Sequence, residues 1–285
     1  MLLDHFDNLL EFLAAHPRDH ARDTPFYRFV DGVAKYAFQE AQPAFEAGRK
    51  VSFAELGLID LPYEKMGAID SIDLFGLDEL LMFAFYHRNR GRYARAVDIG
   101  ANIGLHSILL ARCGCEVESY EPDPSHHAKL RRNLELNGVT SCTSHQAAVS
   151  EKRGTMQFVR VLGNTTSSHL AGSKANPYGV LERFDVEVQD IREIAERADL
   201  MKIDAEGHEA VILNALPITA WQHLDAFVEI GSPENAGAVF SRLSGTGVKL
   251  FSQKTGWMPA KDILDVPVSY KEGGVFISAK DVMPW

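Results

Sequence analysis

One stretch constrains the fold of this chain more than any other, the residues from Asp98 to Gly104, which read Asp-Ile-Gly-Ala-Asn-Ile-Gly. An apolar pair at 96–97 precedes this stretch, and a helical pattern at 106–112 follows it. Gly100 and Gly104 lack a Cβ atom, so the backbone there is free to turn sharply and to approach a ligand closely. We therefore predict a buried strand, then a ligand-binding loop that includes Asn102, and then a helix.

A second strand, expected over 116–120, ends in an acidic residue that supports this interpretation. Glu121 follows Gly104 by 17 residues. At about this separation a doubly wound fold places a carboxylate on the ribose hydroxyls of a nucleoside ligand. We predict that Asp98 and Glu121 hold the two ends of such a ligand.

Five further residues complete the expected cofactor site, and one of them is Asp204 at the end of the fourth expected strand. Pro122 lies in the same loop as Glu121, and Asp123 is expected either to contact the adenine edge or to cap the helix that starts near residue 125. Ala147 and Ala148 end the third expected strand. Their small side chains suit a place beside an adenine ring, although ordinary packing explains them equally well.

Three blocks of the sequence resemble the signature blocks of the FkbM-type S-adenosylmethionine-dependent methyltransferases. These blocks are residues 97–104, the pair Glu121-Pro122 and residues 200–209, within a resemblance that extends over roughly 76–280. The resemblance implies a class I methyltransferase fold with S-adenosyl-L-methionine as cofactor. It also implies O-methylation of carbohydrate or polyketide-type acceptors. The first 70 or so residues carry no such resemblance.

The glycine loop favours S-adenosylmethionine over a nicotinamide dinucleotide. A dinucleotide-binding loop reads Gly-x-Gly-x-x-Gly, and its middle glycine admits the pyrophosphate to the helix N-terminus. Asn102 occupies that position here. A cofactor without phosphates does not need the opening, and the carboxylate of Asp98 suits an amino-acid ammonium group better than a pyrophosphate.

Composition excludes several other classes of function. The chain of 285 residues is 46% hydrophobic, which is ample for a packed core, and its formal net charge is −10. An acidic protein is a poor partner for a nucleic-acid backbone or an anionic membrane. The acidic start and the lack of a long apolar run predict a cytoplasmic protein without a signal peptide or membrane span. The three cysteines lack the spacing of a zinc or redox site, so free thiols are expected.

The alternation of short apolar runs with helical patterns predicts a doubly wound, Rossmann-like and mostly parallel sheet of seven strands. The strands are expected at 95–99, 116–120, 143–149, 199–204, 225–230, 248–253 and 273–279, with a small added β-element between the third and the fourth. We expect a helical N-terminal extension over 1–70 and a methyltransferase domain over 71–285. Apolar stripes on the extension's helices suggest a lid or a homo-oligomer contact.

The reacting groups are expected where the fourth and fifth strands end. Lys202 and Asp204 share one face of the fourth strand, and a buried lysine there needs an acidic partner. Glu229, at the end of the fifth strand, is the predicted partner of Lys202. Asp204 and Glu229 would then meet at the carboxyl edge, where methyl transfer to a hydroxyl needs a base. His208 is a second candidate for that base.

Several alternatives stay open at this point. Asp204, Glu206 and Glu229 also suit a divalent cation, although no metal-specific spacing is present, so we predict no metal site. The polar loop at 164–169 is expected beside the acceptor, and Asn176-Pro177-Tyr178 is expected to form a turn. The rival functions are N-methylation of an amine or peptide and non-catalytic cofactor binding within an assembly.

Overall fold

A computed structural model describes residues 6–67, 69–174 and 179–285 of the chain. The main sheet has eight strands in the order β13-β12-β14-β11-β10-β3-β4-β5. The strands are β3 (Arg95–Ile99), β4 (Glu116–Tyr120), β5 (Cys142–His145), β10 (Leu200–Ile203), β11 (Asp225–Val228), β12 (Lys249–Ser252), β13 (Met258–Pro259) and β14 (Val275–Ser278). The expected segment Asn176-Pro177-Tyr178 lies outside the described residues.

The doubly wound, mostly parallel sheet predicted from the sequence is confirmed. Strands β5, β4, β3, β10 and β11 pair in parallel, whereas β14 runs antiparallel to both β11 and β12. Seven of the eight strands correspond to the predicted runs, and the eighth is the two-residue β13 at the edge. Parallel strands end at the same edge of the sheet, so the loops after β3, β4, β10 and β11 come together there.

The third expected strand, at 143–149, was wrong as a single element. It divides into β5 in the main sheet and β6 (Ala148–Ser150) in a second, four-stranded sheet. That sheet also contains β7 (Gly154–Val161), β8 (His169–Leu170) and β9 (Leu181–Asp190). The break occurs because β6 pairs with β9 rather than continuing along β4. The small added β-element is therefore present and includes the end of the third run.

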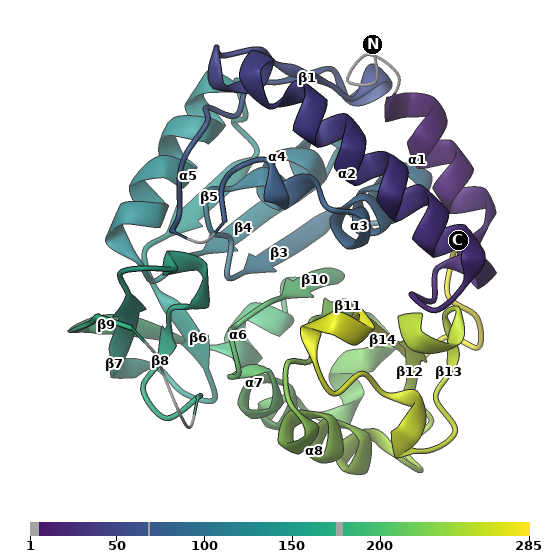
Figure 1. The fold of residues 1–285 in the computed structure, drawn as a ribbon. Coiled ribbons are helices and arrows are strands. Elements are labelled where there is room, and N and C mark those ends of the chain that lie inside the picture. The colour runs from purple at the N-terminus through teal and green to yellow at the C-terminus, as the bar shows by residue number, and fades with distance from the viewer. Residues whose placement is uncertain (1–5, 68, 175–178) are drawn as a thin grey trace.

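Helices cover both faces of the main sheet (Figure 1). One face carries α3 (Leu77–Arg88), α4 (Leu105–Arg112) and α5 (Pro124–Leu136), with α1 (Phe6–Ala15) and α2 (Pro25–Glu46) outside them. The opposite face carries α6 (Ile191–Ala195), α7 (Glu209–Ala215) and α8 (Pro233–Leu243). Each face has its own hydrophobic core. Within the described part of the chain, no helix is long and apolar enough to cross a lipid bilayer.

The N-terminal helices belong to the core of the first face. Leu10 and Leu13 of α1 and Phe38 of α2 are buried in the same cluster as Leu80 and Phe85 of α3. A short hairpin, β1 (Val51–Ser52) and β2 (Leu58–Ile59), follows α2 and packs into this cluster. The division of the chain near residue 70 stays a prediction, since the two parts share one core in space.

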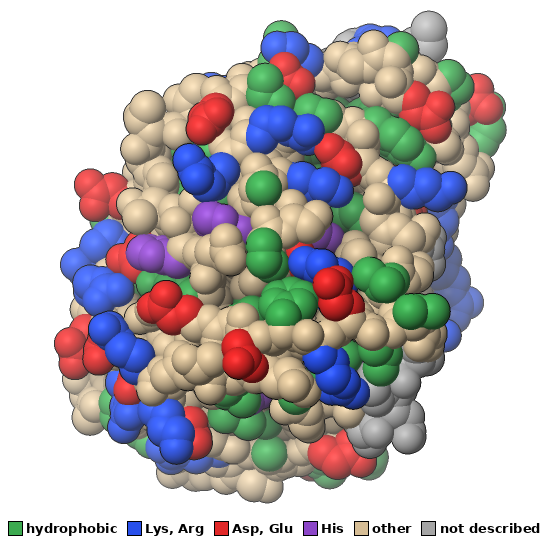
Figure 2. All heavy atoms as spheres, turned by 90° about the vertical axis from the view of Figure 1, so that its left-hand side faces the viewer, with side chains coloured by type: hydrophobic (Ala, Val, Ile, Leu, Met, Phe, Trp, Pro, Cys, Tyr) green, Lys and Arg blue, Asp and Glu red, His purple; other side chains and the backbone are tan. Residues whose placement is uncertain are grey.

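Acidic and basic side chains alternate on the face that carries α5 and the small sheet. Figure 2 shows them intermixed there, with no continuous basic area among the described residues of that view. This distribution agrees with the acidic net charge of the chain. A nucleic-acid backbone would require a basic stripe.

A buried histidine joins the N-terminal segment to the C-terminal part of the chain. His20 is fully buried, its Nε2 lies 2.9 Å from the carbonyl oxygen of Leu13, and its Nδ1 accepts from Nε1 of Trp257 at 2.9 Å. Gln253 donates to the carbonyl oxygen of His20. Burial lowers the pKa of His20 from 6.5 to about 4. The neutral ring therefore fits this contact and the protonated ring does not.

We predict that His20 makes the protein less stable in mild acid. The unfolded chain takes up the proton near pH 6.5 and the folded chain only near pH 4, so stability is lost as pH falls through this interval. By pH 5 the loss should be about 2 kcal/mol. The melting temperature should fall less between pH 7 and pH 5 in His20→Gln than in the parent, whereas the exposed His16→Gln should keep the parent's slope. Equal slopes in all three proteins would contradict this assignment.

Candidate functional site

A cavity of about 240 Å³ opens at the carboxyl edge of the main sheet, where the sequence predicts the site. We call it the first cavity. Its lining combines apolar and polar groups from the loops after β3, β4, β10 and β11, from the connector before α3 and from the small sheet. The residues that line it and that matter below are Asp73, Glu79, Gly100, Asn102, Glu121, Pro122, Asp123, His126, Ala147, Ala148, Thr165, Asp204, Glu206, His208 and Glu229.

The loop after β3 turns under this cavity through two residues with positive φ. Gly100 has φ +75°, and a Cβ atom there would lie 1.8 Å from the carbonyl oxygen of Asp204. The absence of a Cβ atom at Gly100 therefore allows the backbone to approach the loop after β10 closely. The sequence predicted this close approach for a ligand only. Asn102 has φ +51°, a conformation that asparagine tolerates better than most residues. Gly104 starts α4 and packs against Leu130 instead of lining the cavity.

Glu121 faces the first cavity from the end of β4. Its two carboxylate oxygens accept the backbone amides of Asn102 and Asp123, both at 2.8 Å. Burial raises the pKa of Glu121 to about 8, although these two hydrogen bonds favour the charged form. Each oxygen keeps a further lone pair for a ligand hydroxyl. This geometry is compatible with the predicted contact to a ribose.

Asp98 lies behind the loop rather than in the cavity lining. It is fully buried, accepts from the hydroxyl of Ser107 at 2.6 Å, and has an oxygen 3.7 Å from Nζ of Lys202. Lys202 is the residue opposite Asp98 across the parallel pair of β3 and β10. A direct contact of Asp98 with a cofactor stays a prediction, because Asp98 does not line the first cavity.

The prediction that Glu229 pairs with Lys202 was wrong. The ammonium group of Lys202 lies 3.5 Å from Asp204, 3.7 Å from Asp98 and 3.1 Å from the carbonyl oxygen of Gly100. Among the described residues, Lys202 makes no ion pair with Glu229. Burial by itself lowers the pKa of Lys202, but the two carboxylates raise it above its ordinary value. The charged lysine thus ties the loop after β3 to the loop after β10.

Asp123 acts as a helix cap, one of its two predicted roles. Its Oδ1 accepts the amide of Ser125 at 2.8 Å, and Arg160 of β7 donates to both carboxylate oxygens at 2.6 and 2.7 Å. Burial by itself raises the pKa of Asp123, but Arg160 holds it below its ordinary value. Pro122, Ala147 and Ala148 line the first cavity beside it, and their contact with a cofactor stays a prediction.

The polar loop at 164–169 was expected beside the acceptor. The structure places it next to Glu121 and Asp123, because Thr165, Thr166, Ser168 and His169 line the first cavity and no residue of this loop lines the second cavity described below. Nε2 of His126 lies 2.9 Å from the hydroxyl oxygen of Thr165. The backbone amide of Thr165 donates to the carbonyl oxygen of Met66. The loop and the connector before α3 therefore cover the first cavity together.

A second cavity of about 210 Å³ adjoins the first. Its wall includes the residues Arg22, Gly76, Asp78, Met82, Lys202, Phe227, Gln253, Trp257 and Tyr270. Four residues line both cavities, and all four are acidic: Asp73, Glu79, Asp204 and Glu229. We call these four residues the acidic neck. Asp204 and Glu229 follow adjacent parallel strands, so their predicted meeting at the carboxyl edge is confirmed.

The carboxyl groups near the neck differ in how readily they ionise. Glu229 is an exposed residue at the border of both cavities, but the protein atoms around its carboxyl group, followed by the charge of Asp204, raise its pKa well above the ordinary range. Burial, followed by the charge of Asp204, raises the pKa of Glu206 to about 7, against the opposing effect of Lys174. Burial also opposes ionisation of Glu79, but His106 brings its pKa below the ordinary value. Glu79 is therefore the readily ionised member of this set, and Glu229 the proton-binding one.

His208 lines the first cavity but is engaged on both sides of its ring. Its Nε2 lies 2.8 Å from the hydroxyl of Ser150, and its Nδ1 lies 3.0 Å from that of Ser173. Burial lowers the pKa of His208, so the ring is neutral. These contacts hold the small sheet against the loop after β10. The role of His208 as a proton acceptor stays a prediction.

Sequence reasoning missed two members of the acidic neck, Asp73 and Glu79. Both precede the expected methyltransferase strands, and Glu79 looks like one acid in the first turn of an apolar helix. Nε2 of His106 lies 2.7 Å from a carboxylate oxygen of Glu79, and its Nδ1 lies 3.1 Å from the hydroxyl of Tyr86. Only a prediction of how α3 packs on α4 could have found this contact.

The residues present fit S-adenosylmethionine better than a metal ion. Oδ1 of Asn102 is buried without a hydrogen-bond partner among the described residues, so it is free to accept from a ligand donor such as an ammonium group. Glu121 offers acceptors for ribose hydroxyls, and the wall around Tyr120, Ala147 and Phe158 is apolar enough for an adenine ring. Within the described ranges, no three histidine, cysteine or acidic side chains are arranged to hold a metal ion.

Comparison with known proteins points to methyltransferases. The family model of the methyltransferase FkbM domain matches residues 98–246. The chain is 25% identical over 189 residues to Methyltransferase 1 of Beauveria bassiana (strain ARSEF 2860), a match that covers 57% of this chain and 75% of that protein. It is 27% identical over 198 residues to Methyltransferase sdnD of Sordaria araneosa, covering 57% of this chain and 76% of the relative. A crystal structure of precorrin-6y C5,15-methyltransferase from Geobacter metallireducens GS-15 covers 79% of this chain and 96% of its own, with 13% identity and a TM-score of 0.41.

We predict that Glu121 and Asp98 differ in what they contribute. Glu121→Ala should weaken the binding of S-adenosylhomocysteine by about one to two decades, because two hydrogen bonds of its carboxyl group, each worth about 0.5–1.5 kcal/mol, are lost. Asp98→Asn should mainly lower the melting temperature, because it weakens the buried pair with Lys202. Calorimetric titration and thermal unfolding of both variants measure these effects, and Glu116→Gln at the exposed opposite end of β4 is the control. Unchanged affinity in Glu121→Ala would remove this residue from the cofactor site.

Proposed function

Since the chain belongs to the FkbM methyltransferase family, we propose that it methylates a hydroxyl group of a small molecule, a carbohydrate or a polyketide-type acceptor. It is an S-adenosylmethionine-dependent enzyme with the class I methyltransferase fold. The observation that carries the proposal is the acidic neck between two adjoining cavities at the carboxyl edge of the sheet.

Each of the two cavities is proposed to bind a different ligand. S-adenosylmethionine, when bound, supplies a methyl group on a positively charged sulfur. Glu121 and Asn102 would hold it in the first cavity, and the second cavity would receive the acceptor. The acidic neck then lies between donor and acceptor, where carboxylates favour a nearby positive charge. Positioning both partners on one line contributes substantially to the rate of such a displacement.

Glu229 is the proposed base for the acceptor hydroxyl. It lines both cavities and follows β11, next to Asp204 at the end of β10. Its raised pKa suits a group that must bind the released proton, since a hydroxyl gives up its proton only as the new bond forms. Asp204 would orient the same hydroxyl, and Lys202 keeps Asp204 in place through the ion pair.

The neck favours a hydroxyl over an amine as acceptor. Carboxylates around an amine stabilise its protonated form, which has no lone pair for attack. A hydroxyl gains instead, because a nearby carboxylate accepts its hydrogen bond and then its proton. The two reactions give different products, one with a methyl–oxygen bond and the other with a methyl–nitrogen bond. Identifying the new bond in the product therefore distinguishes them.

The proposed function is tested by label transfer. The protein is incubated with S-adenosylmethionine that carries a ¹³C-labelled methyl group and with a metabolite extract of the source organism. A new methyl signal bound to oxygen in the carbon NMR spectrum supports the proposal. A methyl group bound to nitrogen would contradict O-methylation and retain the enzyme class.

We predict that Glu229→Gln lowers kcat by about two to four decades while the affinity for S-adenosylhomocysteine stays within about threefold, the pattern of a lost general base. Because the pKa of Glu229 is raised, kcat of the parent should increase with pH as the carboxylate forms, and this dependence should be lost in the variant. The exposed Glu196→Gln is the matched control. A fully active, pH-dependent Glu229→Gln protein would assign the base to another member of the neck, and Glu79→Gln would be measured next.

A further inference from the structure

The second cavity is completed by a part of the chain that lies outside the family match. Arg22 lies between α1 and α2, some 76 residues before the matched region begins. It lines the second cavity together with Asp78 and Glu79 of α3 and with Trp257 and Tyr270 from the C-terminal part. The N-terminal segment is therefore part of the site wall and not only a cover for the core.

Contacts on both sides hold this segment in place. Asp78 receives hydrogen bonds from Tyr27 at 2.9 Å and from Gln253 at 2.6 Å, and it pairs with the guanidinium of Arg22. Gly256 lies so close to the segment that a Cβ atom there would be 2.5 Å from the carbonyl oxygen of Arg18. Such a packed segment presents Arg22 to the cavity in a defined orientation.

Arg22 has hydrogen-bond donors that Asp78 does not use. Asp78 accepts from one of the two terminal nitrogens, and 30% of the Arg22 side chain is exposed. A guanidinium group has five N–H donors in all, so N–H groups remain for an acceptor atom in the cavity. An oxygen atom of the acceptor molecule is a suitable partner for one of them.

The charges of the second cavity limit which acceptors fit. Five of its lining residues are acidic (Asp73, Asp78, Glu79, Asp204, Glu229) and two are basic (Arg22, Lys202). Asp78 neutralises Arg22, and Asp98 and Asp204 neutralise Lys202. The negative charge that remains repels a carboxylate or a phosphate. Arg22 thus serves as a hydrogen-bond donor rather than as an anion site.

The remaining wall is apolar and small. Met82, Phe227, Trp257 and Tyr270 line it, in a volume of about 210 Å³. An apolar and largely aromatic wall packs well against the face of a ring. The acids at one end can accept hydrogen bonds from the hydroxyl groups of such a ring.

We propose that Arg22 is a specificity residue for the acceptor: its guanidinium donates an N–H to an oxygen of an uncharged or cationic hydroxylated ring, and the cavity rejects carboxylate and phosphate compounds. This inference rests on the proposed function, because it assumes that the second cavity holds the methyl acceptor. It adds the charge class of the acceptor and a residue that the family match does not reach.

The charge class is tested without knowing the acceptor. Full-length protein is incubated with tritium-labelled S-adenosylmethionine and the metabolite extract, and the products are separated on anion- and cation-exchange columns. The total label incorporated tests the proposed function, whereas its distribution tests this inference. Label in the neutral and cationic fractions is expected. Label retained mainly on the anion exchanger would overturn the charge preference and leave the methyltransferase assignment intact.

Variants of Arg22 test the donor itself on the labelled fraction. Arg22→Lys keeps a positive charge beside Asp78 but removes the guanidinium N–H donors that Asp78 does not use, so KM for that fraction should rise about tenfold with kcat within about twofold. Its melting temperature and its affinity for S-adenosylhomocysteine should match the parent. Arg22→Gln removes the charge as well, and its melting temperature reports the loss of the pair with Asp78.

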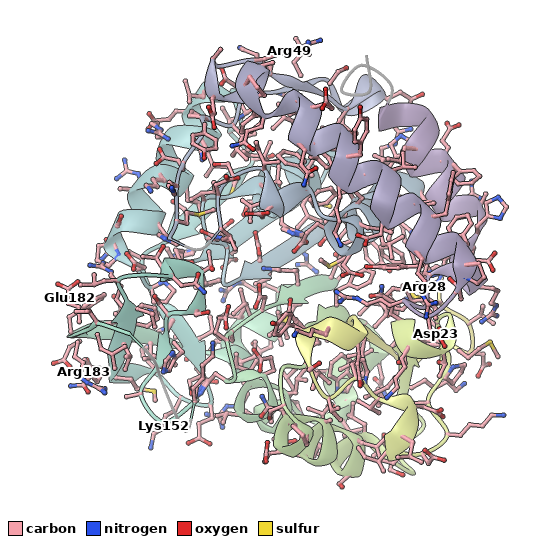
Figure 3. The ribbon with its side chains drawn as sticks, viewed as in Figure 1. Asp23, Arg28, Arg49, Lys152, Glu182 and Arg183 are labelled. Carbon is pink, nitrogen blue, oxygen red and sulfur yellow. The ribbon has the colours of Figure 1, made fainter. Side chains whose placement is uncertain are left out.

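The matched control is Arg28→Gln. Figure 3 places Arg28 and Asp23 at the outer edge of the contact between the N-terminal helices and the C-terminal part, and Arg28 is exposed. Its KM should equal that of the parent. If Arg22→Lys is as stable as the parent and keeps the parent's KM, Arg22 does not contact the acceptor.

Discussion

The site depends on a single buried ammonium group. Lys202 stands in the central strand of the sheet, and its Nζ contacts Asp98 of β3, Asp204 after β10 and the carbonyl oxygen of Gly100. Removing one partner of such a buried pair costs about 3–5 kcal/mol, so these groups must stay together. The loop after β3 and the loop after β10 are thereby placed by one interaction. The close contact of Gly100 with the backbone of Asp204 follows from the same arrangement.

Parallel strand topology explains why acids collect around this lysine. Strands β3, β4, β10 and β11 end at one edge, and each is followed by a loop that carries Asn102, Glu121, Asp204 or Glu229 toward the cavities. Bringing several carboxyl groups together raises the pKa of the more enclosed ones, as for Glu229. A positively charged sulfonium offsets that repulsion, so the neck is electrostatically suited to the cofactor of this family. The same charges make the site unfavourable for anions.

Segments outside the sheet determine the shape of the two cavities. The connector before α3 and the loop at 164–169 meet over the first cavity through the hydrogen bond from Thr165 to Met66. The segment around Arg22 and the turn around Trp257 close the second cavity, joined by the buried ring of His20. These covering segments come from the ends of the chain and from the inserted small sheet. The sheet thus positions the acidic residues of the neck, and the added segments form the outer walls of the two cavities.

The sequence by itself determined the parts of this protein that depend on local physics. Alternating apolar runs predicted β3 and β4 with their observed bounds, and the glycine loop and Glu121 were located because a strand, a turn and a helix leave a short and regular pattern. Tertiary structure alone decided the partner of Lys202, which pairs across β3 with Asp98 rather than with Glu229. It also decided the places of Glu79 and Arg22, because both reach the site only through the packing of α3 and the N-terminal segment. No local pattern records such contacts, since they join residues far apart in the chain and depend on how whole elements dock.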